Sequence, residues 1–259
     1  MIGLCTDSTA QVPSELCTRH GIEVVPATVV IDDEEHLDEP GALDAFYGHV
    51  TRHGRDSVTL VEPSSGQFAA AYDDLVARGC TEIVSLHSGG SLNAARLAAH
   101  ATAVPVRVVD PGAPGFALSC AVWAAGESIT RGASLDQVVT VAERVVPQVG
   151  NLFIVGATGA ASAGVELVTF VDAERQPLEP CPSVFDAINS LASRVLATGG
   201  RLRVAVGHSD PPTAAIADAL EAAIGEPASV IDVVRYRIGP GAAAQAVPGT
   251  VGCYWFPAD

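Results

Sequence analysis

The feature that most constrains the fold is the alternation of short apolar runs with amphipathic stretches through the first 147 residues. Runs such as 2–6 and 82–86 have the length and Val, Ile and Leu content of buried strands. Between them, Phe68, Ala71, Tyr72, Leu75 and Val76 follow the i, i+3, i+4, i+7, i+8 spacing of a helix stripe. Alternating strands and helices predict a mostly parallel, Rossmann-like sheet covered on both faces.

The pattern changes near Pro147 and predicts a second, smaller α+β domain with more antiparallel pairing. We therefore predict an N-terminal α/β domain over 1–147 and a C-terminal α+β domain over 148–259. The predicted strands are 2–6, 23–31, 82–86, 106–110, 152–155, 165–172, 202–207, 229–236 and 250–256. The predicted helices are 12–20, 42–53, one following Gly66, 92–102, 116–130, one from Ser134 to Val146, 184–197 and 213–224.

Composition excludes several classes of partner. A formal net charge of −16 opposes binding to nucleic acid and adhesion to an anionic membrane surface. No apolar run approaches the ~20 residues of a membrane span, and the start lacks the pattern of a signal peptide, so we expect no stable membrane insertion and a cytoplasmic location. The six cysteines form no C-x-x-C pair, which predicts free thiols and no metal site.

Three polar loops follow predicted strands, at 6–9, 62–66 and 87–91. In open α/β sheets, loops at the carboxyl ends of strands hold ligands, and a helix amino end that follows such a loop favours an anion. Asp7 and Ser8 are equally consistent with orienting a ligand head group and with capping the next helix. His87 is interpreted mainly as a structural hydrogen-bonding residue.

Several short motifs resemble the DegV family, in the same order as in the family. Residues 6–13, TDSTAQVP, are similar to its opening TDSTADLP. Five later segments of this chain also resemble family motifs. Residues 24–26 resemble VVPL, and residues 63–68 with Tyr72 resemble TSQPSPGEF…Y without its first three residues. Residues 83–92 resemble IISIHISSGLSGT, residues 108–110 resemble VID, and residues 239–241 resemble THTGPG.

The resemblance implies a two-domain DegV-like α/β fold (the EDD fold) that binds a fatty acid. It implies an apolar tunnel between the domains, with the lipid carboxylate held near the domain interface. In several family members the protein presents that carboxylate to a separate kinase. No basic patch of the kind that contacts the kinase stands in 180–189, so a kinase partner is not expected here.

This chain departs from the family at the residues that hold the carboxylate. Leu60 stands at the Thr of TSQP, Asn93 at the Ser of LSG, and Arg237 at the His of THTG. Asn93 can donate two hydrogen bonds, and Arg237 either binds an anion or pairs with an acidic neighbour. Gly89 and Gly90 replace the two serines before Gly-Leu and open room for backbone approach. The predicted head-group set is Asn93, Arg237, Gly89, Gly90, Ser91 and Leu60, with Asp7, Ser8, Thr9, Ser64, His87 and Gly239 nearby.

We therefore predict a lipid-binding protein that uses no cofactor and has no catalytic residues. Two alternatives stay open. One is an enzyme that acts on a small phosphorylated or carboxylated substrate through Asp7, Ser8, His87 and Arg237, although no nucleophile elbow or metal set supports it. The other is a ligand-free regulatory or interaction protein whose tunnel is filled by its own side chains.

Overall fold

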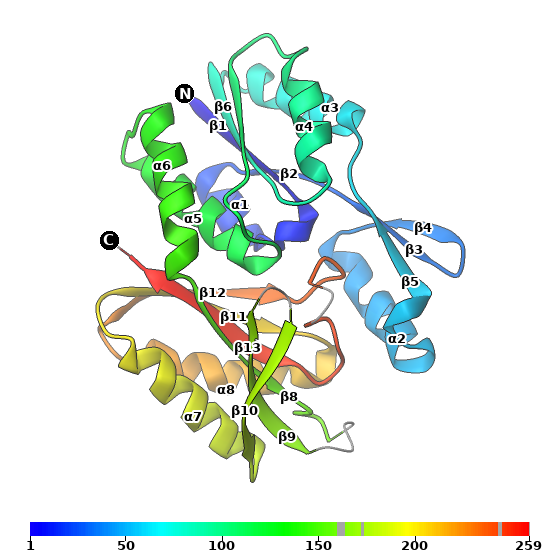
Figure 1. Ribbon diagram of the computed structural model, residues 1–259, viewed down its shortest axis with the longest axis vertical. Helices are drawn as coiled ribbons and strands as arrows, with labels where there is room; N and C mark the ends of the chain where they lie inside the picture. The colour runs from blue at the N-terminus through cyan, green and yellow to red at the C-terminus, as the bar shows by residue number, and fades with distance from the viewer. Residues whose placement is uncertain (160–163, 172–173, 243–244, 259) are drawn as a thin grey trace. The chain divides into compact units, whose positions relative to one another are not determined.

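The computed structural model describes residues 1–159, 164–171, 174–242 and 245–258. The chain divides into two compact units, and each is described by itself (Figure 1). Unit 1 comprises Met1–Glu39 and Thr59–Pro147, and unit 2 comprises Pro40–Val58 and Gln148–Asp259. The boundary at Pro147 coincides with the boundary predicted between the two domains. Residues 40–58, however, belong to unit 2, whereas the prediction placed them in the first domain. No helix among the described residues is long and apolar enough to cross a membrane.

Unit 1 is built on a parallel sheet. Its strands are β1 (Ile2–Asp7), β2 (Glu23–Val25), β3 (Thr28–Ile31), β4 (Glu34–Leu37), β5 (Val58–Val61, whose first residue belongs to unit 2), β6 (Glu82–Leu86) and β7 (Val106–Val109). Its helices are η1 (Ser8–Ala10), α1 (Ser14–His20), α3 (Ser65–Ala77), α4 (Ser91–Ala99), α5 (Phe116–Thr130), α6 (Leu135–Val145) and η4 (Val146–Gln148), which ends at the unit boundary. The main sheet has the order β2-β1-β6-β7 and every neighbouring pair is parallel, as predicted.

Helices cover both faces of this sheet. α3 and α4 pack on one face, and α5 and α6 pack on the other (Figure 1). Two of these helices, α3 and α6, start with a capping box. The Ser64 hydroxyl accepts a hydrogen bond from the Gln67 N–H, and the Ser134 hydroxyl accepts one from the Gln137 N–H. α5 matches its predicted range, and Trp123 lies fully buried within it.

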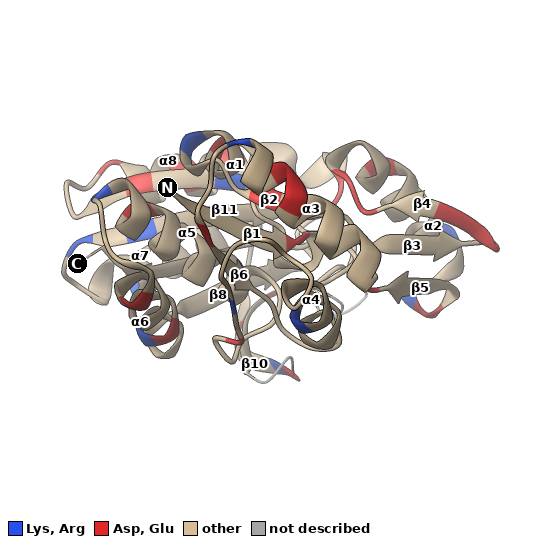
Figure 2. Cartoon of the chain, turned by 90° about the horizontal axis from the view of Figure 1, so that it is seen from above, with Lys and Arg blue, Asp and Glu red and all other residues tan. Residues whose placement is uncertain are grey.

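The predicted strand over 23–31 is wrong as one element. Pro26 cannot donate a ladder hydrogen bond, and the chain leaves the parallel sheet there. β2 pairs with β1, whereas β3 turns back through Asp32 and Asp33 into β4. Both aspartates have positive φ, 51° and 64°, the backbone of a tight two-residue hairpin. This acidic hairpin is prominent among the charges in Figure 2.

Unit 2 contains a six-stranded mixed sheet. Its strands are β8 (Gly150–Val155), β9 (Val165–Val171), β10 (Glu174–Cys181), β11 (Leu202–His208), β12 (Val230–Arg237) and β13 (Val251–Pro257). Its helices are η2 (Pro40–Ala42), α2 (Leu43–His53), η3 (Arg55–Ser57), α7 (Val184–Ala197), η5 (Pro211–Thr213) and α8 (Ala214–Gly225). The order is β10-β9-β8-β13-β11-β12, and β11–β12 is its one parallel pair among the pairings described.

β10 is missing from the predicted strands because Pro177 and Pro180 argue against a central strand. It lies at the edge of the sheet, where a missing N–H is tolerated. The predicted end of the preceding strand at Asp172 lies outside the described residues. α7 matches its predicted range, 184–197, and a hydrogen bond from the Asp186 N–H to the Ser183 hydroxyl caps it.

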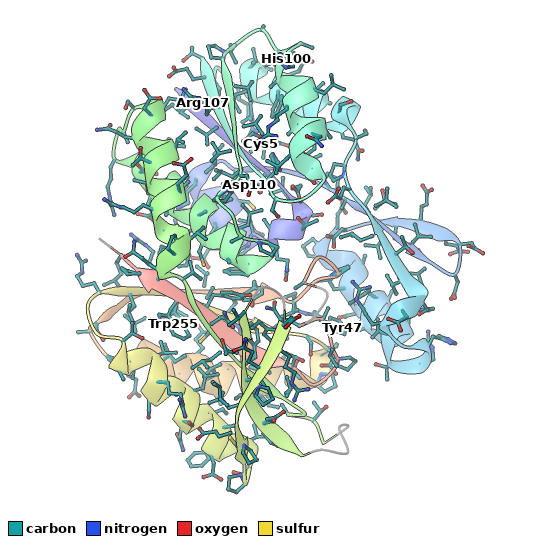
Figure 3. All side chains as sticks on the ribbon, viewed as in Figure 1. Cys5, Tyr47, His100, Arg107, Asp110 and Trp255 are labelled. Atoms are coloured by element: carbon teal, nitrogen blue, oxygen red, sulfur yellow. The ribbon has the colours of Figure 1, made fainter. Side chains whose placement is uncertain are left out.

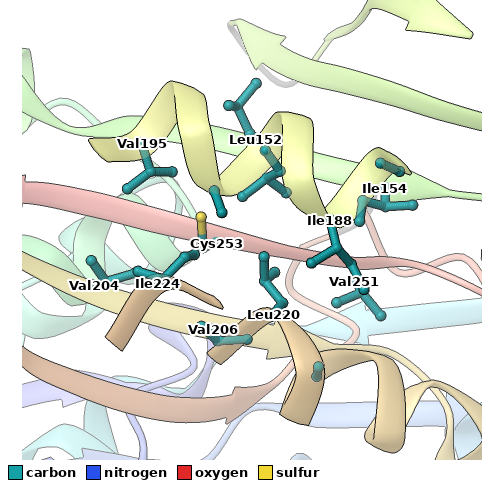
Figure 4. Close-up of a cluster of buried hydrophobic side chains, with 14 of the residues drawn as sticks. Leu152, Ile154, Ile188, Val195, Val204, Val206, Leu220, Ile224, Val251 and Cys253 are labelled. Carbon is teal, nitrogen blue, oxygen red and sulfur yellow. The ribbon is translucent and has the colours of Figure 1, made fainter. Parts of the chain in front are cut away.

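The core of unit 2 lies between its sheet and the helices α7 and α8. Alternate residues of β8, β11 and β13 point toward these helices, including Ile154, Val204 and Cys253 (Figure 4). All three side chains are fully buried. Aliphatic side chains dominate this cluster, as the low aromatic content of 5% requires.

The opposite face of the same sheet carries aromatic rings. Phe153 packs edge to face against both Phe170 and Tyr254, with ring centroids 5.3 and 5.5 Å apart. Gly252 makes this possible, because a Cβ there would lie 2.3 Å from the Phe153 ring. Gly207 likewise leaves space for the Tyr236 ring, 2.2 Å from its ideal Cβ.

Three hydrogen bonds explain why residues 40–58 group with unit 2. The Tyr47 hydroxyl donates to the Ile238 carbonyl at 2.7 Å, and the Arg55 guanidinium donates to the Pro240 carbonyl at 2.7 Å. Arg237 donates to Asp44 at 2.9 Å. Figure 3 labels Tyr47 on α2 and Trp255 on β13 of this unit. Sequence proximity places 40–58 in the first half of the chain, but these contacts decide its packing.

Candidate functional site

The loop that follows β1 is fixed by its own side chains. Asp7 is fully buried, and its Oδ1 accepts hydrogen bonds from the Thr9 N–H at 3.1 Å and from the Thr9 hydroxyl. The Ser8 hydroxyl oxygen accepts the Ala27 N–H at 2.9 Å and so ties the loop to the start of β3. Asp7 therefore caps η1. The predicted capping of the helix over 12–20 is not seen, because α1 begins at Ser14 and its N-cap, Pro13, makes no side-chain capping bond.

His87 links this loop to β6 through buried hydrogen bonds. Its Nδ1 lies 2.7 Å from Asp7 Oδ2, and its Nε2 lies 2.6 Å from the Ser85 hydroxyl. Tyr72 on α3 donates its hydroxyl proton to Ser85 at 2.9 Å. The four side chains form one chain of hydrogen bonds, and all four are fully buried.

The order Asp7–His87–Ser85 is that of an acyl-transfer triad, but its environment excludes that use. The Ser85 hydroxyl is fully buried, and it is engaged by His87 on one side and Tyr72 on the other. A substrate carbonyl has no approach to this oxygen, and nucleophile geometry requires one. We assign these residues a structural role, the stabilisation of the loop at 7–9.

Ser85 and Tyr72 were not among the predicted site residues. The signal that could have found Ser85 is its spacing from His87, because residues two apart on a strand share a face. Two polar side chains on one face of an otherwise apolar strand require a common hydrogen-bonding partner. Tyr72 was identified only as part of the helix stripe and of a family motif. Its hydroxyl meets Ser85 through the packing of α3 on the sheet.

A second group of predicted residues lies at the amino end of α4. Gly89 has φ +65°, and Gly90 is the N-cap. The Gly90 N–H donates to Glu62 Oε1 at 3.0 Å. Ser91, the first residue of α4, is 1% exposed, and its hydroxyl has no hydrogen-bond partner among the described residues. Sequence reasoning identified Gly89, Gly90 and Ser91 but missed Glu62.

The remaining predicted residues of unit 1 lie around the same helices. Asn93 is exposed on the first turn of α4, and its amide side chain faces no described hydrogen-bonding partner. Leu60 is half-buried on β5. The Ser64 hydroxyl caps α3. The roles of Asn93 and Leu60 toward a ligand stay predictions.

Arg237 and Gly239 belong to unit 2. Arg237 ends β12, donates to the Ser209 carbonyl at 3.0 Å and forms an ion pair with Asp44. Of the two predicted roles of Arg237, the structure therefore shows the pairing with an acidic neighbour. Burial, together with the positive charges of Arg237 and Arg235, lowers the pKa of His208 to about 4. Gly239 is buried, and its carbonyl accepts the Ala242 N–H in the turn that follows β12.

Within the described residues, no group of three or more His, Cys, Asp or Glu is arranged to hold a metal ion. The six cysteines are free thiols. Burial raises the pKa of Cys5 to about 12, which keeps this thiol protonated at neutral pH. Figure 3 shows Cys5 on the central strand β1.

The fold is that of a two-unit α/β protein with polar loops at the carboxyl ends of its parallel strands, which is where open α/β sheets hold ligands. Residues 1–158 match the family described as "Uncharacterised protein, DegV family". A DegV domain-containing protein of Streptomyces coelicolor is 30% identical over 275 residues, covering 97% of this chain and 96% of that protein. The chain belongs to the DegV family.

Solved structures share the fold over the whole chain. A hypothetical protein of Thermotoga maritima, described as revealing a fatty acid binding function, has a TM-score of 0.81 and 22% identity, with 99% of each chain covered. A Thermus thermophilus DegV family protein, described by its fatty acid binding, has a TM-score of 0.78 and 25% identity, with 99% of each chain covered. These likenesses confirm the predicted DegV-like α/β fold.

Proposed function

We propose that this protein binds one long-chain fatty acid or a related lipid and acts as a carrier. The observation that carries the proposal is the match over nearly the whole chain to DegV proteins that are described as binding fatty acids. The match covers 99% of this chain and 99% of each of these proteins, so it supports a shared ligand class as well as a shared ancestor. The protein performs no chemistry on the lipid in this proposal.

The lipid tail supplies most of the affinity. Burial of an alkyl chain contributes ~0.8 kcal/mol per methylene, so each added methylene tightens Kd about fourfold while the site accommodates it. The polar head contributes less affinity but fixes the orientation of the lipid. We place the head at the amino end of α4, near Gly90, Ser91 and Asn93.

Three observations support this placement. The helix amino end offers backbone N–H groups, and Ser91 adds a buried hydroxyl without a described partner. The buried chain of Asp7, His87 and Ser85 holds the adjacent end of β6 in place. Arg237 is a weaker candidate than its charge suggests, because Asp44 already neutralises it.

Presentation of the lipid to a kinase is not included in the proposal. Residues 180–189, where the resemblance would place a basic patch, contain one acidic and no basic side chain. A cytoplasmic location and the absence of a cofactor stay predictions.

Native mass spectrometry of the protein purified from a bacterium tests the proposal. We expect a co-purified lipid that is lost on denaturation, and displacement of a fluorescent fatty acid by unlabelled ones with affinity that rises with chain length. The absence of both co-purified lipid and binding of added fatty acids would contradict the proposal. A small phosphorylated metabolite in place of the lipid would favour the enzyme alternative.

A further inference from the structure

Glu62 supplies a negative charge at the helix end where we place the lipid head. It lies in the loop between β5 and α3, and its carboxylate accepts the Gly90 N–H at 3.0 Å. Partial positive charge at a helix amino end favours an anion, and here the protein provides that anion itself. A bound lipid therefore meets a carboxylate beside the backbone amides.

The Glu62 carboxylate lies close to both glycines at the start of α4. A Cβ on Gly90 would lie 1.9 Å from Glu62 Oε2 and 2.9 Å from its carboxyl carbon, and a Cβ on Gly89 would lie 3.1 Å from Oε1. Gly90 has φ −71° and ψ −26°, a conformation that any L-residue adopts. A side chain at position 90 would therefore displace the Glu62 carboxylate, although the backbone at this position accepts any L-residue.

Ser91 provides the independent sign of a ligand at this place. Its hydroxyl is buried to 1% exposure in the first turn of α4 and has no hydrogen-bond partner among the described residues. Buried hydroxyls are normally bonded, so this one is available to a ligand atom. A ligand hydroxyl can donate a hydrogen bond to the exposed Glu62 carboxylate, and the Ser91 hydroxyl proton has no acceptor among the described residues.

We propose that Glu62 makes the site select lipids with an uncharged, hydrogen-bond-donating head over lipids with an ionised carboxylate. This inference rests on the proposed lipid-binding function. An ionised head would stand within a few ångströms of the Glu62 carboxylate, and repulsion at that separation weakens binding by about tenfold or more. A long-chain alcohol or an undissociated acid meets no such repulsion.

The test compares displacement of a fluorescent lipid by tetradecanol and by tetradecanoate at mildly alkaline pH, where the acid is ionised. The wild-type protein should prefer the alcohol by about tenfold or more. Glu62→Gln removes the charge and should shift the preference toward the acid by about the same factor. Glu143→Gln is the matched control, because it removes the same charge from an exposed position on α6.

Gly90→Ser provides a second route to the same result. The new Cβ forces the flexible Glu62 side chain away from α4 without removing its charge, so this variant should also shift toward the acid. Equal wild-type binding of both lipids, or equal shifts in the Glu62 and Glu143 variants, would overturn the selectivity. Failure of every variant to bind either lipid would instead overturn the lipid-binding function.

Discussion

Replacement of His87 by Phe isolates the energetic role of the buried hydrogen-bond chain. The Phe ring keeps the size of the side chain and its edge contact with Phe68, whose ring centroid lies 4.7 Å from that of His87. It removes the hydrogen bonds of His87 to Asp7 and to Ser85. Asp7 Oδ2 then has no partner among the described residues, although Oδ1 keeps both hydrogen bonds from Thr9.

The expected loss follows from the burial of Asp7. Removing one hydrogen-bond partner of a buried polar group costs about 1–3 kcal/mol, and more when the group left behind is a carboxylate. Thr9 still donates two hydrogen bonds to the Asp7 carboxylate and so offsets part of this cost. We therefore expect the free energy of unfolding to fall by about 3 kcal/mol. Adding Asp7→Asn to the His87→Phe variant removes the carboxylate that lost its partner and should restore about 1–2 kcal/mol of that loss.

Urea unfolding followed by Trp123 fluorescence measures this loss, in a Trp255→Phe background that leaves one reporter, in unit 1. His100→Ala is the control, because His100 is exposed at the carboxyl end of α4 (Figure 3). A loss below about 1 kcal/mol for His87→Phe, or an equal loss for His100→Ala, would refute the assignment of a structural role.

Three further predictions concern stability. Burial raises the pKa of Asp38 from 3.8 to about 6, so the folded state binds its proton more tightly and wild-type stability should fall as pH rises between these values. Asp38→Asn should remove about 1–2 kcal/mol of this pH dependence, a range reduced for the partial exposure of the carboxyl. Ser64→Ala should cost about 1 kcal/mol through loss of the α3 capping box. Gly207→Ala should cost about 1–3 kcal/mol or more, because its Cβ would overlap the Tyr236 ring.

Chemical denaturation at a series of pH values checks the Asp38 prediction, and parallel pH profiles of wild type and variant would contradict it. Circular dichroism melts check the other two. Gly41→Ala, with nothing within 4 Å of its Cβ, is the control for Gly207. An effect of Gly207→Ala no larger than that of Gly41→Ala would show that Tyr236 moves aside, and an unchanged melt for Ser64→Ala would show that water replaces the cap.

Local patterns in the sequence were sufficient to predict most elements and the fold class. The ranges of α5 and α7 and the capping box of α6 are confirmed, since periodicity and capping act within a few residues along the chain. The errors fall where the local signal is ambiguous. Pro26 divides a Val-rich run between two sheets, and the prolines of β10 conceal an edge strand.

The sequence by itself determined the alternation of strands and helices, the polar loops that follow β1, β5 and β6, and the family motifs. Only the tertiary structure decided which side chains meet. His87 joins Asp7 across 80 residues, Gly90 joins Glu62 across 28, and Arg237 joins Asp44 across 193. Hydrophobic periodicity is a property of neighbours along the chain, whereas these pairings depend on strand order and packing. The charge at the α4 amino end therefore became visible only in three dimensions.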